Sequence, residues 1–382
     1  MRHLGDIKKL SGAAIEPVDC ITGGSPCQDL SVAGKRAGLA GGRSGLFFEQ
    51  IRVIKEMRSG TANVDGGPWP RYMVWENVPG ALSSNRGKDF ATVLEEAVRI
   101  VEPEAPSIPT PAKWPTSGCL MGGGWSIAWR VHDAQFWGVP QRRKRIALVC
   151  DFGGHTAPEI LFERKGLRGD TAEGGTAREE IAGADESGFN PAVARSLIAR
   201  ADGSPCADRG PNIVCSLRQG GCDGGGKGAL VQTEKSGTLG TGNDQTLRAK
   251  ANCAYREDTE TYPVQNMVAR RLTPLEWERL QGYPDGWTNI GKWIDSSGKK
   301  HRSSDNGRYK ALGNSIALPF WFWLLRRISA QYERPATLGS LFDGIGGFPL
   351  CWERCNGKGT ALWASEIEEF PMAVTKKRFG EG

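Results

Sequence analysis

A cysteine in a loop of small residues is the strongest candidate for chemistry in this sequence. Cys27 lies within Gly23-Gly24-Ser25-Pro26-Cys27-Gln28, directly after the apolar stretch 18–21 and ahead of a segment with helical spacing. A thiol on a turn between a strand and a helix can be held as the thiolate, which is the nucleophilic form. A lone cysteine is more often a small buried hydrophobic residue. Cys27 is therefore a candidate nucleophile only if other segments supply its partners.

Charged residues beside two further apolar stretches are candidate partners. Glu76 and Asn77 follow the stretch 71–75, and the carboxyl ends of parallel strands are where α/β proteins bind ligands. Arg143 and Arg145 precede another apolar stretch, and their alternation places them on one face of an extended segment, so they could reach one ligand together. An exposed surface turn for Glu76 and a solvated basic edge strand for the arginines are the alternatives.

A glycine-rich turn near the C-terminus has the pattern of a nucleotide-binding unit. Residues 338–348 fit a strand, a glycine turn and a helix start, and the next strand, 361–364, leads to Glu366. Glycines let a ligand approach the backbone at a helix N-terminus, and an acidic residue about twenty positions further on can bind ribose hydroxyls. The whole unit predicts a cofactor that contains adenosine.

The composition is that of a folded, two-domain protein in a reducing compartment. The chain has 382 residues with 39% hydrophobic content, enough for a large core. We expect no membrane span and no signal peptide, because no apolar stretch approaches about 18 residues. Ten scattered cysteines favour the cytosol. A net charge of +6 is compatible with a polyanionic partner.

Several elements must position the candidate residues. Apolar spacing predicts helices over 46–57, 89–101 and 316–328. Thr273, Pro274 and Glu276 form a capping-box sequence that starts a helix ending at Gly282. The polar residues 289–308 are predicted to be a loop.

The region from about 151 to 268 has a different character, with many glycines and short apolar runs. Ser196-Leu197, Ser216-Leu217, Thr238-Leu239 and Thr246-Leu247 form a loose repeat, which predicts short strands joined by glycine-rich turns. Nearby basic residues suit contacts to phosphates and base edges. A loosely packed β-region with ordinary surface charge is the alternative. The cysteines of this region lack the spacing of a zinc site.

Taken together, these segments resemble the DNA (cytosine-5) methyltransferase family. The resemblance covers most of the chain outside about 152–268. The matching segments are Phe342-Asp343-Gly344-Ile345-Gly346-Gly347, Glu366, Gly5-Asp6-Ile7, Pro26-Cys27-Gln28, Glu76-Asn77-Val78, Gln141-Arg142-Arg143-Lys144-Arg145, Arg271-Leu272-Thr273-Pro274 and Gly313-Asn314-Ser315.

The order of these segments departs from the order usual in the family, in which the glycine turn opens the chain. The resemblance therefore implies a circular permutation, with the break between a helix at 370–379 and a strand at 4–7. That strand lies at the sheet edge in this family, so a break there disrupts few ladder bonds. The implied fold is a doubly wound, mostly parallel α/β sheet, a Rossmann-like methyltransferase domain (1–150 with 309–382), and a smaller irregular β-rich target-recognition domain (151–308).

The resemblance also implies a mechanism. Cys27 would attack carbon 6 of a flipped cytosine in a specific duplex DNA sequence, so that carbon 5 takes a methyl group from S-adenosylmethionine. Glu76 would act at ring N3, and Arg145, with Arg143, would stabilise O2. The loop 31–43 would close over the base, and no metal is needed.

The resemblance assigns further residues to binding. Substrate contacts are assigned to Gln28, Ser31, Arg43, Asn77 and Gln141. Cofactor contacts are assigned to Asp6, Ile7, Pro26, Leu46, Asn314, Ser315, Phe342, Gly344, Ile345, Gly346, Gly347, Glu366 and Ile367.

The implied partner is double-stranded DNA, bound by a monomer in the cytoplasm of a bacterium or of a phage-infected cell, with a cognate restriction endonuclease acting on the same site. Two alternatives remain open. A tRNA cytosine methyltransferase would share the motifs, but the long insertion favours duplex DNA, since RNA recognition favours splayed loops. A non-catalytic DNA-binding relic is disfavoured by the intact set of Cys27, Glu76 and Arg145.

Overall fold

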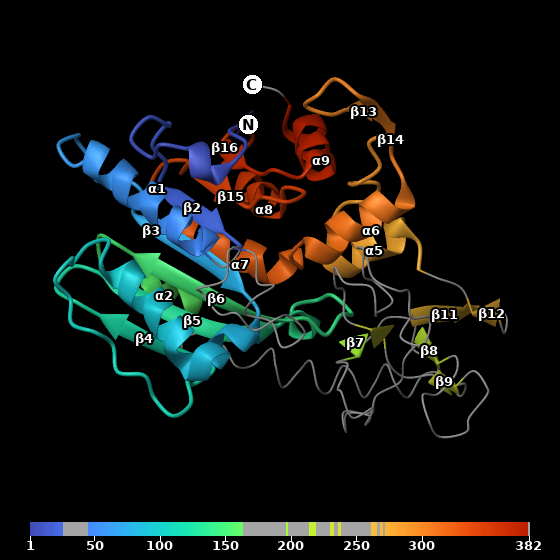
Figure 1. The fold of residues 1–382 in the computed structure, drawn as a ribbon, viewed down its shortest axis with the longest axis horizontal. Helices are drawn as coiled ribbons and strands as arrows, with labels where there is room; N and C mark the ends of the chain where they lie inside the picture. The colour runs from blue at the N-terminus through green and yellow to red at the C-terminus, as the bar shows by residue number, and fades with distance from the viewer. Residues whose placement is uncertain are drawn as a thin grey trace.

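An eight-stranded sheet, with strand order β1-β16-β15-β2-β3-β6-β5-β4, forms the centre of the fold (Figure 1). The computed structural model describes residues 1–25, 45–162 and 272–380, together with six short strands between residues 196 and 269. The strands of the sheet are β1 (Arg2–His3), β2 (Cys20–Gly23), β3 (Tyr72–Asn77), β4 (Ser117–Met121), β5 (Ser126–Asp133), β6 (Lys144–Asp151), β15 (Leu338–Leu341) and β16 (Ala361–Ser365).

The first half of the sheet is parallel, and the second half is antiparallel. Strands β1, β16, β15, β2 and β3 run in one direction, whereas β6 pairs antiparallel with both β3 and β5. The carboxyl end of β3 therefore lies beside the amino end of β6, with Asn77 opposite Ile146 and Glu76 opposite Ala147. This topology confirms a mixed, mostly parallel α/β sheet and brings Glu76 close to Arg145, the second residue of β6.

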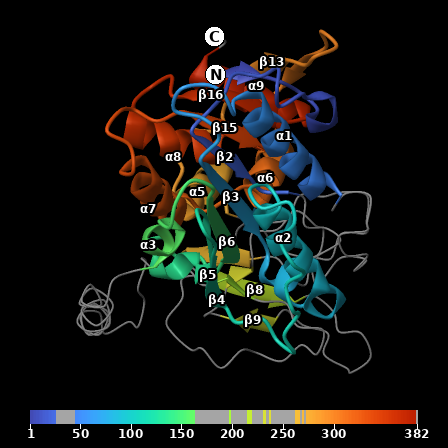
Figure 2. The ribbon, with the colours of Figure 1, turned by 90° about the vertical axis from the view of Figure 1, so that its left-hand side faces the viewer.

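Helices cover both faces of the sheet (Figure 2). Alternate residues of β3 belong to different cores: Tyr72 and Val74 pack with one cluster, and Met73 and Trp75 with the other. The first cluster includes α3 (Ala157–Leu161), α7 (Leu318–Ser329) and α8 (Gly347–Asn356); the second includes α1 (Leu46–Gly60) and α2 (Lys88–Val98). The predicted helices at 46–57, 89–101 and 316–328 are confirmed, because their apolar spacing matches the faces that the sheet buries.

The first strand and the last helix lie side by side at one edge of the sheet (Figure 1). Strand β1 is the edge strand, paired parallel with β16, and the last helix, α9 (Glu369–Phe379), packs beside it through a contact of 3.3 Å between Thr375 Oγ1 and His3 Nε2. The strand predicted at 4–7 is found earlier and is shorter, at Arg2–His3. Gly5 has φ +71°, and Asp6 caps the 3₁₀ turn Ile7–Lys9, so the extended conformation ends at His3.

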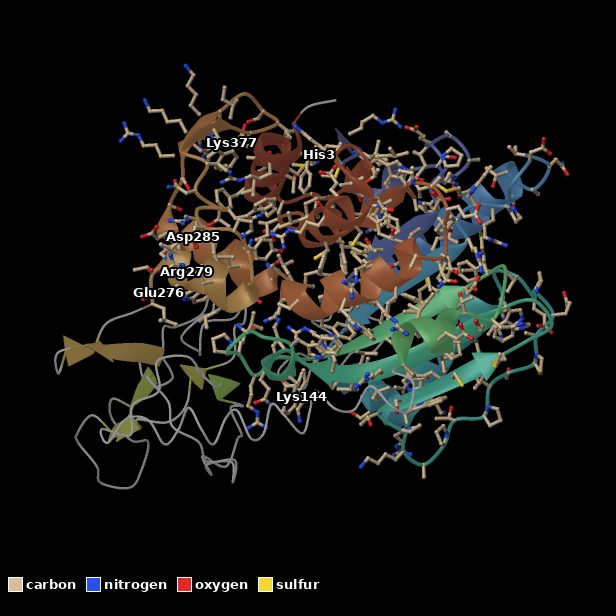
Figure 3. The ribbon with its side chains drawn as sticks, turned by 180° about the vertical axis from the view of Figure 1, so that it is seen from behind. His3, Lys144, Glu276, Arg279, Asp285 and Lys377 are labelled. Carbon is tan, nitrogen blue, oxygen red and sulfur yellow. The ribbon has the colours of Figure 1, made fainter. Side chains whose placement is uncertain are left out.

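The segment after residue 271 packs into the same core as the sheet. Helix α5 (Pro274–Gln281) begins with the predicted capping box and ends at Gly282, and it carries an exposed ion pair between Arg279 and Asp285 (Figure 3). Its Trp277, together with Leu272, Trp287 and Ile290, belongs to the core cluster that contains α7 and α8. The predicted boundary at residue 308 therefore separates residues that share one core.

The predicted loop at 289–308 is wrong. Strands β13 (Lys292–Ile294) and β14 (Lys300–Arg302) form a hairpin there, and α6 (Asp305–Asn314) begins before the segment ends. Trp293 stacks on His301 with ring centroids 4.4 Å apart. Periodicity did not reveal the hairpin because its strands have only three residues each and are mostly polar. Strand β4, in which exposed and half-buried residues alternate, was also missed.

Two small sheets lie between residues 196 and 269. One pairs β7 (Ser196–Leu197) with β10 (Ser236–Gly237), and the other has the order β12-β11-β8-β9. Ser216-Leu217 falls within β8 (Val214–Arg218), so two of the four predicted repeat strands are present. Thr238-Leu239 and Thr246-Leu247 lie outside the described residues. The remaining strands are β9 (Leu230–Gln232), β11 (Thr261–Gln265) and β12 (Val268–Ala269).

Within the described parts of the chain, no helix combines the length and apolar character needed to cross a membrane.

Candidate active site

The glycine turn between β15 and α8 has a backbone that few side chains allow. Phe342, Gly344 and Gly346 all have positive φ, of +55°, +57° and +80°. A non-glycine residue in this region, such as Phe342, is typical of a strained functional turn. Ile345, between the two glycines, is fully buried, and its carbonyl accepts a hydrogen bond of 2.8 Å from Trp287 Nε1.

The three glycines of the turn have different surroundings. A Cβ added to Gly344 would meet nothing within 4 Å, whereas one on Gly346 would lie 2.5 Å from Phe379. A Cβ on Gly347 would lie 2.5 Å from the Tyr283 hydroxyl. Gly344 therefore faces the open side on which a ligand can approach, and the other two glycines are required by packing.

Glu366, directly after β16, is hydrogen-bonded to the glycine turn. Its carboxylate accepts hydrogen bonds from the backbone N–H groups of Gly344 (2.8 Å), Ile367 (2.7 Å) and Glu368 (2.9 Å). Burial raises the pKa of Glu366, and these amide donors act in the opposite direction. The predicted unit of turn and acidic residue is thus brought together by direct contact.

Asp343 is a buried acid within the same turn. Burial raises its pKa to about 8, and the charge of Glu366 adds to that rise, while the hydrogen bond from Ser340 opposes it. The Ser340 hydroxyl donates to Asp343 Oδ1 at 2.5 Å, and Oδ2 has no hydrogen-bond partner within the described part of the chain. Asp343 therefore carries a proton near neutral pH, which limits the negative charge beside Glu366.

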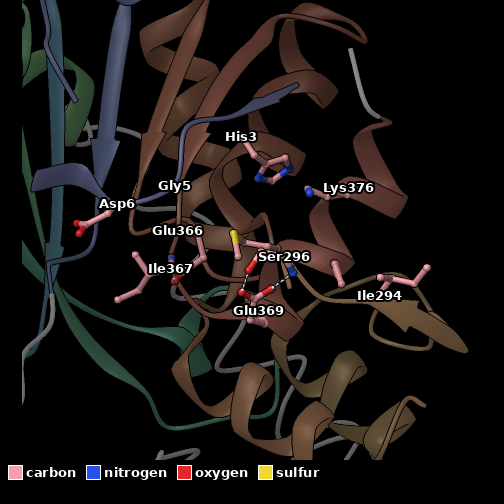
Figure 4. A pocket seen from close by; sticks show the side chains of 11 residues that line it. His3, Gly5, Asp6, Ile294, Ser296, Glu366, Ile367, Glu369 and Lys376 are labelled. Carbon is pink, nitrogen blue, oxygen red and sulfur yellow. Dashed lines mark hydrogen bonds between the residues drawn. The ribbon is translucent and has the colours of Figure 1, made fainter. Parts of the chain in front are cut away.

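A pocket of about 330 Å³ opens beside Glu366 (Figure 4). Asp6, Glu366 and Ile367, all predicted cofactor contacts, line it together with Ile294, Ser296 and Glu369. Carboxylates accept hydrogen bonds from hydroxyl and amino groups, and the Ile367 side chain, 66% exposed, offers apolar surface. This combination of an apolar wall with a few polar groups fits an adenosyl group.

The remaining predicted cofactor residues are distributed around this region. Ile7 is buried against α1, where its carbonyl accepts from Arg52, and Leu46 is the first residue of α1. Asn314 ends α6 and is exposed, whereas Ser315 is buried. Pro26 lies outside the described residues.

The substrate end of the site contains an ion pair between β3 and β6. Arg145 Nε lies 2.9 Å from Glu76 Oε1, and both side chains are largely buried. Gly24 approaches the same carboxylate so closely that an added Cβ would lie 2.9 Å from Glu76 Oε2. The pair therefore lies directly beside the chain that leads into the cysteine loop.

The start of the cysteine loop is anchored on β3. Trp75 Nε1 donates to Ser25 Oγ at 2.9 Å, and Asn77 Nδ2 donates to the Ser25 carbonyl at 3.2 Å. These bonds hold Ser25 next to Glu76, so Asn77, predicted as a substrate contact, positions the loop. Cys27, Gln28, Ser31 and Arg43 lie outside the described residues.

Arg143, the other arginine predicted to reach the substrate, contacts the turn that follows α6. Its buried guanidinium donates to the carbonyls of Gly313 (3.2 Å) and Ser315 (2.6 Å). Strand β6 begins only at Lys144, and the Arg143 backbone is held by Asp133 and Ala134. Strand alternation therefore does not apply to Arg143.

Several polar residues near the site were not identified from the sequence. Tyr283 shares a hydroxyl–hydroxyl bond with the predicted residue Ser315, and Trp287 donates to the Ile345 carbonyl, so the segment after α5 is joined both to the turn after α6 and to the glycine turn. Gln50 is buried beside Gly23, and its amide, like that of the predicted residue Gln141, has no partner within the described residues. Buried amides without partners are often satisfied by water or a ligand. The sequence carried no spacing signal for any of these contacts.

The comparisons with known proteins agree on a family of DNA methylases. A model of the family described as C-5 cytosine-specific DNA methylase matches residues 2–99 and 214–330. A protein of Escherichia phage P1, named DNA N-6-adenine-methyltransferase, is 30% identical over 426 residues, covering 86% of this chain and 55% of that protein. The type II methyltransferase M.BsuFI of Bacillus subtilis is 30% identical over 145 residues, covering 38% of this chain and 27% of that protein.

The chain thus spans about half the length, or less, of these two curated relatives. Among solved structures, the S. pombe Dnmt2 methyltransferase aligns with 85% of this chain and 83% of its own, with 15% identity and a TM-score of 0.40.

Proposed function

The chain belongs to the C-5 cytosine-specific DNA methylase family, and from this premise we propose that it methylates carbon 5 of a flipped cytosine in a specific sequence of duplex DNA. The observation that carries the proposal is the Glu76–Arg145 pair, 2.9 Å apart, beside the anchored start of the Cys27 loop. A carboxyl group and a guanidinium at one strand end suit the N3 and O2 edge of a pyrimidine.

The proposed chemistry begins with the Cys27 thiolate. Its sulfur bonds to carbon 6, and the electron pair of the 5,6 double bond becomes available at carbon 5. Glu76 holds a proton at N3, and Arg145 compensates the negative charge on O2. S-adenosylmethionine, when bound, supplies the methyl group, and loss of the carbon-5 proton then expels the thiolate. Because these ring atoms are inaccessible in a stacked duplex, the base must be flipped.

We assign Arg143 a positioning role instead of a direct one. Its bonds to the Gly313 and Ser315 carbonyls fix the turn between α6 and α7 against the start of β6. Through that turn, Arg143 places Asn314 and Ser315 for the cofactor while Arg145 remains free to meet the base. Gln141, buried beside Arg143, is the further substrate-side amide.

Cofactor binding is divided between main-chain and side-chain groups. Gly344 lets the ligand approach the turn, Glu366 and Asp6 accept hydrogen bonds from the ribose and adenine, and Ile367 supplies apolar contact. The other residues proposed to contact or support the cofactor are Ile7, Pro26, Leu46, Asn314, Ser315, Phe342, Ile345, Gly346 and Gly347.

We propose that the catalytic domain, residues 1–150 with 309–382, is circularly permuted and that DNA recognition resides in the region 151–308. Supporting the permutation, the glycine turn follows β15 near the C-terminus, outside the residues matched by the family model. Strand β1 and helix α9 lie side by side at the sheet edge, where a chain break removes few ladder bonds. We further propose that the chain binds double-stranded DNA as a monomer. A restriction endonuclease that recognises the same DNA sequence is its proposed functional partner.

Methylation of adenine at N6 is a second candidate, favoured by the printed name of the phage P1 relative. The chemistry of the site separates the two. An exocyclic amine is itself nucleophilic, so its methylation needs no thiol, whereas carbon 5 of cytosine requires activation by a covalent bond at carbon 6. Dependence on Cys27 therefore identifies the cytosine reaction.

The test is methyl transfer from labelled S-adenosylmethionine to unmethylated duplex DNA, with nucleoside analysis and bisulfite sequencing of the product. We expect 5-methylcytosine in one sequence context, and its loss in Cys27→Ala. N6-methyladenine formed equally by wild type and Cys27→Ala would establish the adenine reaction instead. Transfer to tRNA alone, or cofactor binding without transfer to any nucleic acid, would contradict DNA methylation.

A further inference from the structure

The hairpin formed by β13 and β14 supplies one wall of the pocket beside Glu366 (Figure 4). Ile294 ends β13 and Ser296 lies in the hairpin turn, and both line the pocket together with Asp6, Glu366 and Ile367. Ile294 and Ile367 are 60% and 66% exposed, and both line the same pocket. Two exposed isoleucines in one pocket indicate a surface that a partly apolar ligand covers.

The hairpin is joined to the start of α9, next to Glu366. The Ser296 backbone N–H donates to Glu369 Oε2 at 2.9 Å, and the Ser296 hydroxyl donates to Glu369 Oε1 (Figure 4). Trp293 packs edge-on against Phe370, with ring centroids 5.8 Å apart. These contacts attach the hairpin to residues 369–370, a few positions after the carboxylate that is hydrogen-bonded to the glycine turn.

The hairpin is also internally rigid. Asp295 accepts hydrogen bonds from the backbone N–H groups of Ser297 (3.0 Å) and Lys299 (2.9 Å), and its other oxygen lies 2.6 Å from His301 Nε2. Outside the hairpin, Lys377 of α9 donates to the Ile290 carbonyl at 3.0 Å. A preformed wall of this kind binds a ligand without first having to be ordered.

We propose that the β13–β14 hairpin is the outer wall of the adenosine site, and that the Ser296–Glu369 contact sets the affinity for the adenosyl group. This inference rests on the proposed cofactor, S-adenosylmethionine, and adds to it a binding element from a different part of the chain. Glu366 and Asp6 provide the polar inner side of the site, and Ile294 and Ser296 enclose the ligand from the solvent side. The hairpin has no role in the chemistry at the cytosine, which lies at the Glu76–Arg145 end.

The test measures binding of S-adenosylhomocysteine and of free adenosine to the whole chain by isothermal titration calorimetry. Ser296→Ala removes one of the two bonds to Glu369, and Glu369→Ala removes both. We expect Ser296→Ala to raise both dissociation constants by about 3- to 10-fold, the net value of one typical hydrogen bond, and Glu369→Ala to raise them further. Affinity for duplex DNA should stay unchanged.

Ser297→Ala is the matched control, because Ser297 lies on the same turn but bonds only to Asp295 and does not line the pocket. It should leave both dissociation constants within about 1.5-fold of wild type. Melting temperatures of all variants report whether each has folded. Wild-type affinity in folded Ser296→Ala and Glu369→Ala would overturn the hairpin inference alone. Failure of the wild-type chain to bind S-adenosylhomocysteine or S-adenosylmethionine would overturn the proposed function itself.

Discussion

The glycine turn at the adenosine end of the site is formed by main-chain groups within a short stretch of sequence, whereas the substrate end joins side chains to groups that lie far apart in the sequence. Glu366 and the Gly344 amide that it holds are 22 residues apart. Arg143 and the Ser315 carbonyl that it holds are 172 residues apart. A main-chain site tolerates most side-chain changes except an added Cβ, while a side-chain site depends on the few groups that form it.

The proposed hairpin wall of the adenosine site is an exception to this contrast. Ser296 and Glu369 are 73 residues apart, so the solvent-side wall of the adenosine site is assembled from a distance, like the substrate end. The glycine turn with Glu366 is local in sequence, whereas Asp6 and the hairpin reach the pocket from distant parts of the chain. Substitutions at the substrate end should therefore lower kcat for methyl transfer, and substitutions at the adenosine end should raise the dissociation constant for S-adenosylhomocysteine.

The largest expected effect is at the substrate end. Glu76→Gln removes the acid that holds a proton at N3 while keeping the shape of the side chain. We expect kcat for methyl transfer to fall by about 10²- to 10⁴-fold, the range of general acid–base catalysis, with the dissociation constant for S-adenosylhomocysteine unchanged. A parallel loss of cofactor affinity would show that the two ends are not separable.

The next prediction compares two glycines of the same turn. Gly344→Ala places a methyl group on the open, ligand-facing side and should weaken S-adenosylhomocysteine binding by about 10-fold, with a stability loss of only about 1–2 kcal/mol from its positive φ. Gly347→Ala places the methyl group against Tyr283 and Ile316 and should instead destabilise the fold by about 1–3 kcal/mol. Calorimetric titration and thermal melting distinguish these outcomes.

A third prediction separates the two arginines. Arg143→Ala leaves the Gly313 and Ser315 carbonyls buried without their donor, so the free energy of unfolding should fall by about 2–3 kcal/mol in urea titrations. Arg145→Ala should abolish methyl transfer with a smaller loss of stability, because the Glu76 side chain is 14% exposed and keeps partial contact with water, whereas Arg143 is 3% exposed. Equal stability losses in the two variants would contradict the division of roles.

The smallest expected effect concerns pH. The folded-state pKa of Asp343 is raised from 3.8 to about 8, so the folded protein binds a proton that the unfolded chain releases. Stability should therefore be greatest below pH 4 as far as this group is concerned, fall as the pH rises, and level off above about pH 8. Asp343→Asn should flatten this decline and gain at least about 1.4 kcal/mol at pH 8, the equivalent of one pKa unit. Urea titrations at pH 5 and pH 8 provide the measurement.

The sequence alone was sufficient for the features that depend on neighbouring residues. The capping box at Thr273, the glycine turn with Glu366, and the helices α1, α2 and α7 were all predictable, because caps, positive φ angles and helical periodicity are set within a few residues. The strand at 4–7 and the loop at 289–308 were predicted wrongly. In one, Gly5 ends the strand early; in the other, contacts of Trp293 with His301 and Phe370 stabilise a short polar hairpin.

Only the tertiary structure decided which charged groups meet. Arg143 and Arg145 are two residues apart with the same chemistry, yet one holds the turn at 313–315 and the other pairs with Glu76. The sequence determined that acids, arginines and a thiol were present and that a glycine turn preceded a helix. Their pairing was decided by strand register and by packing between distant segments, since contacts across long chain separations follow from how the whole core is filled.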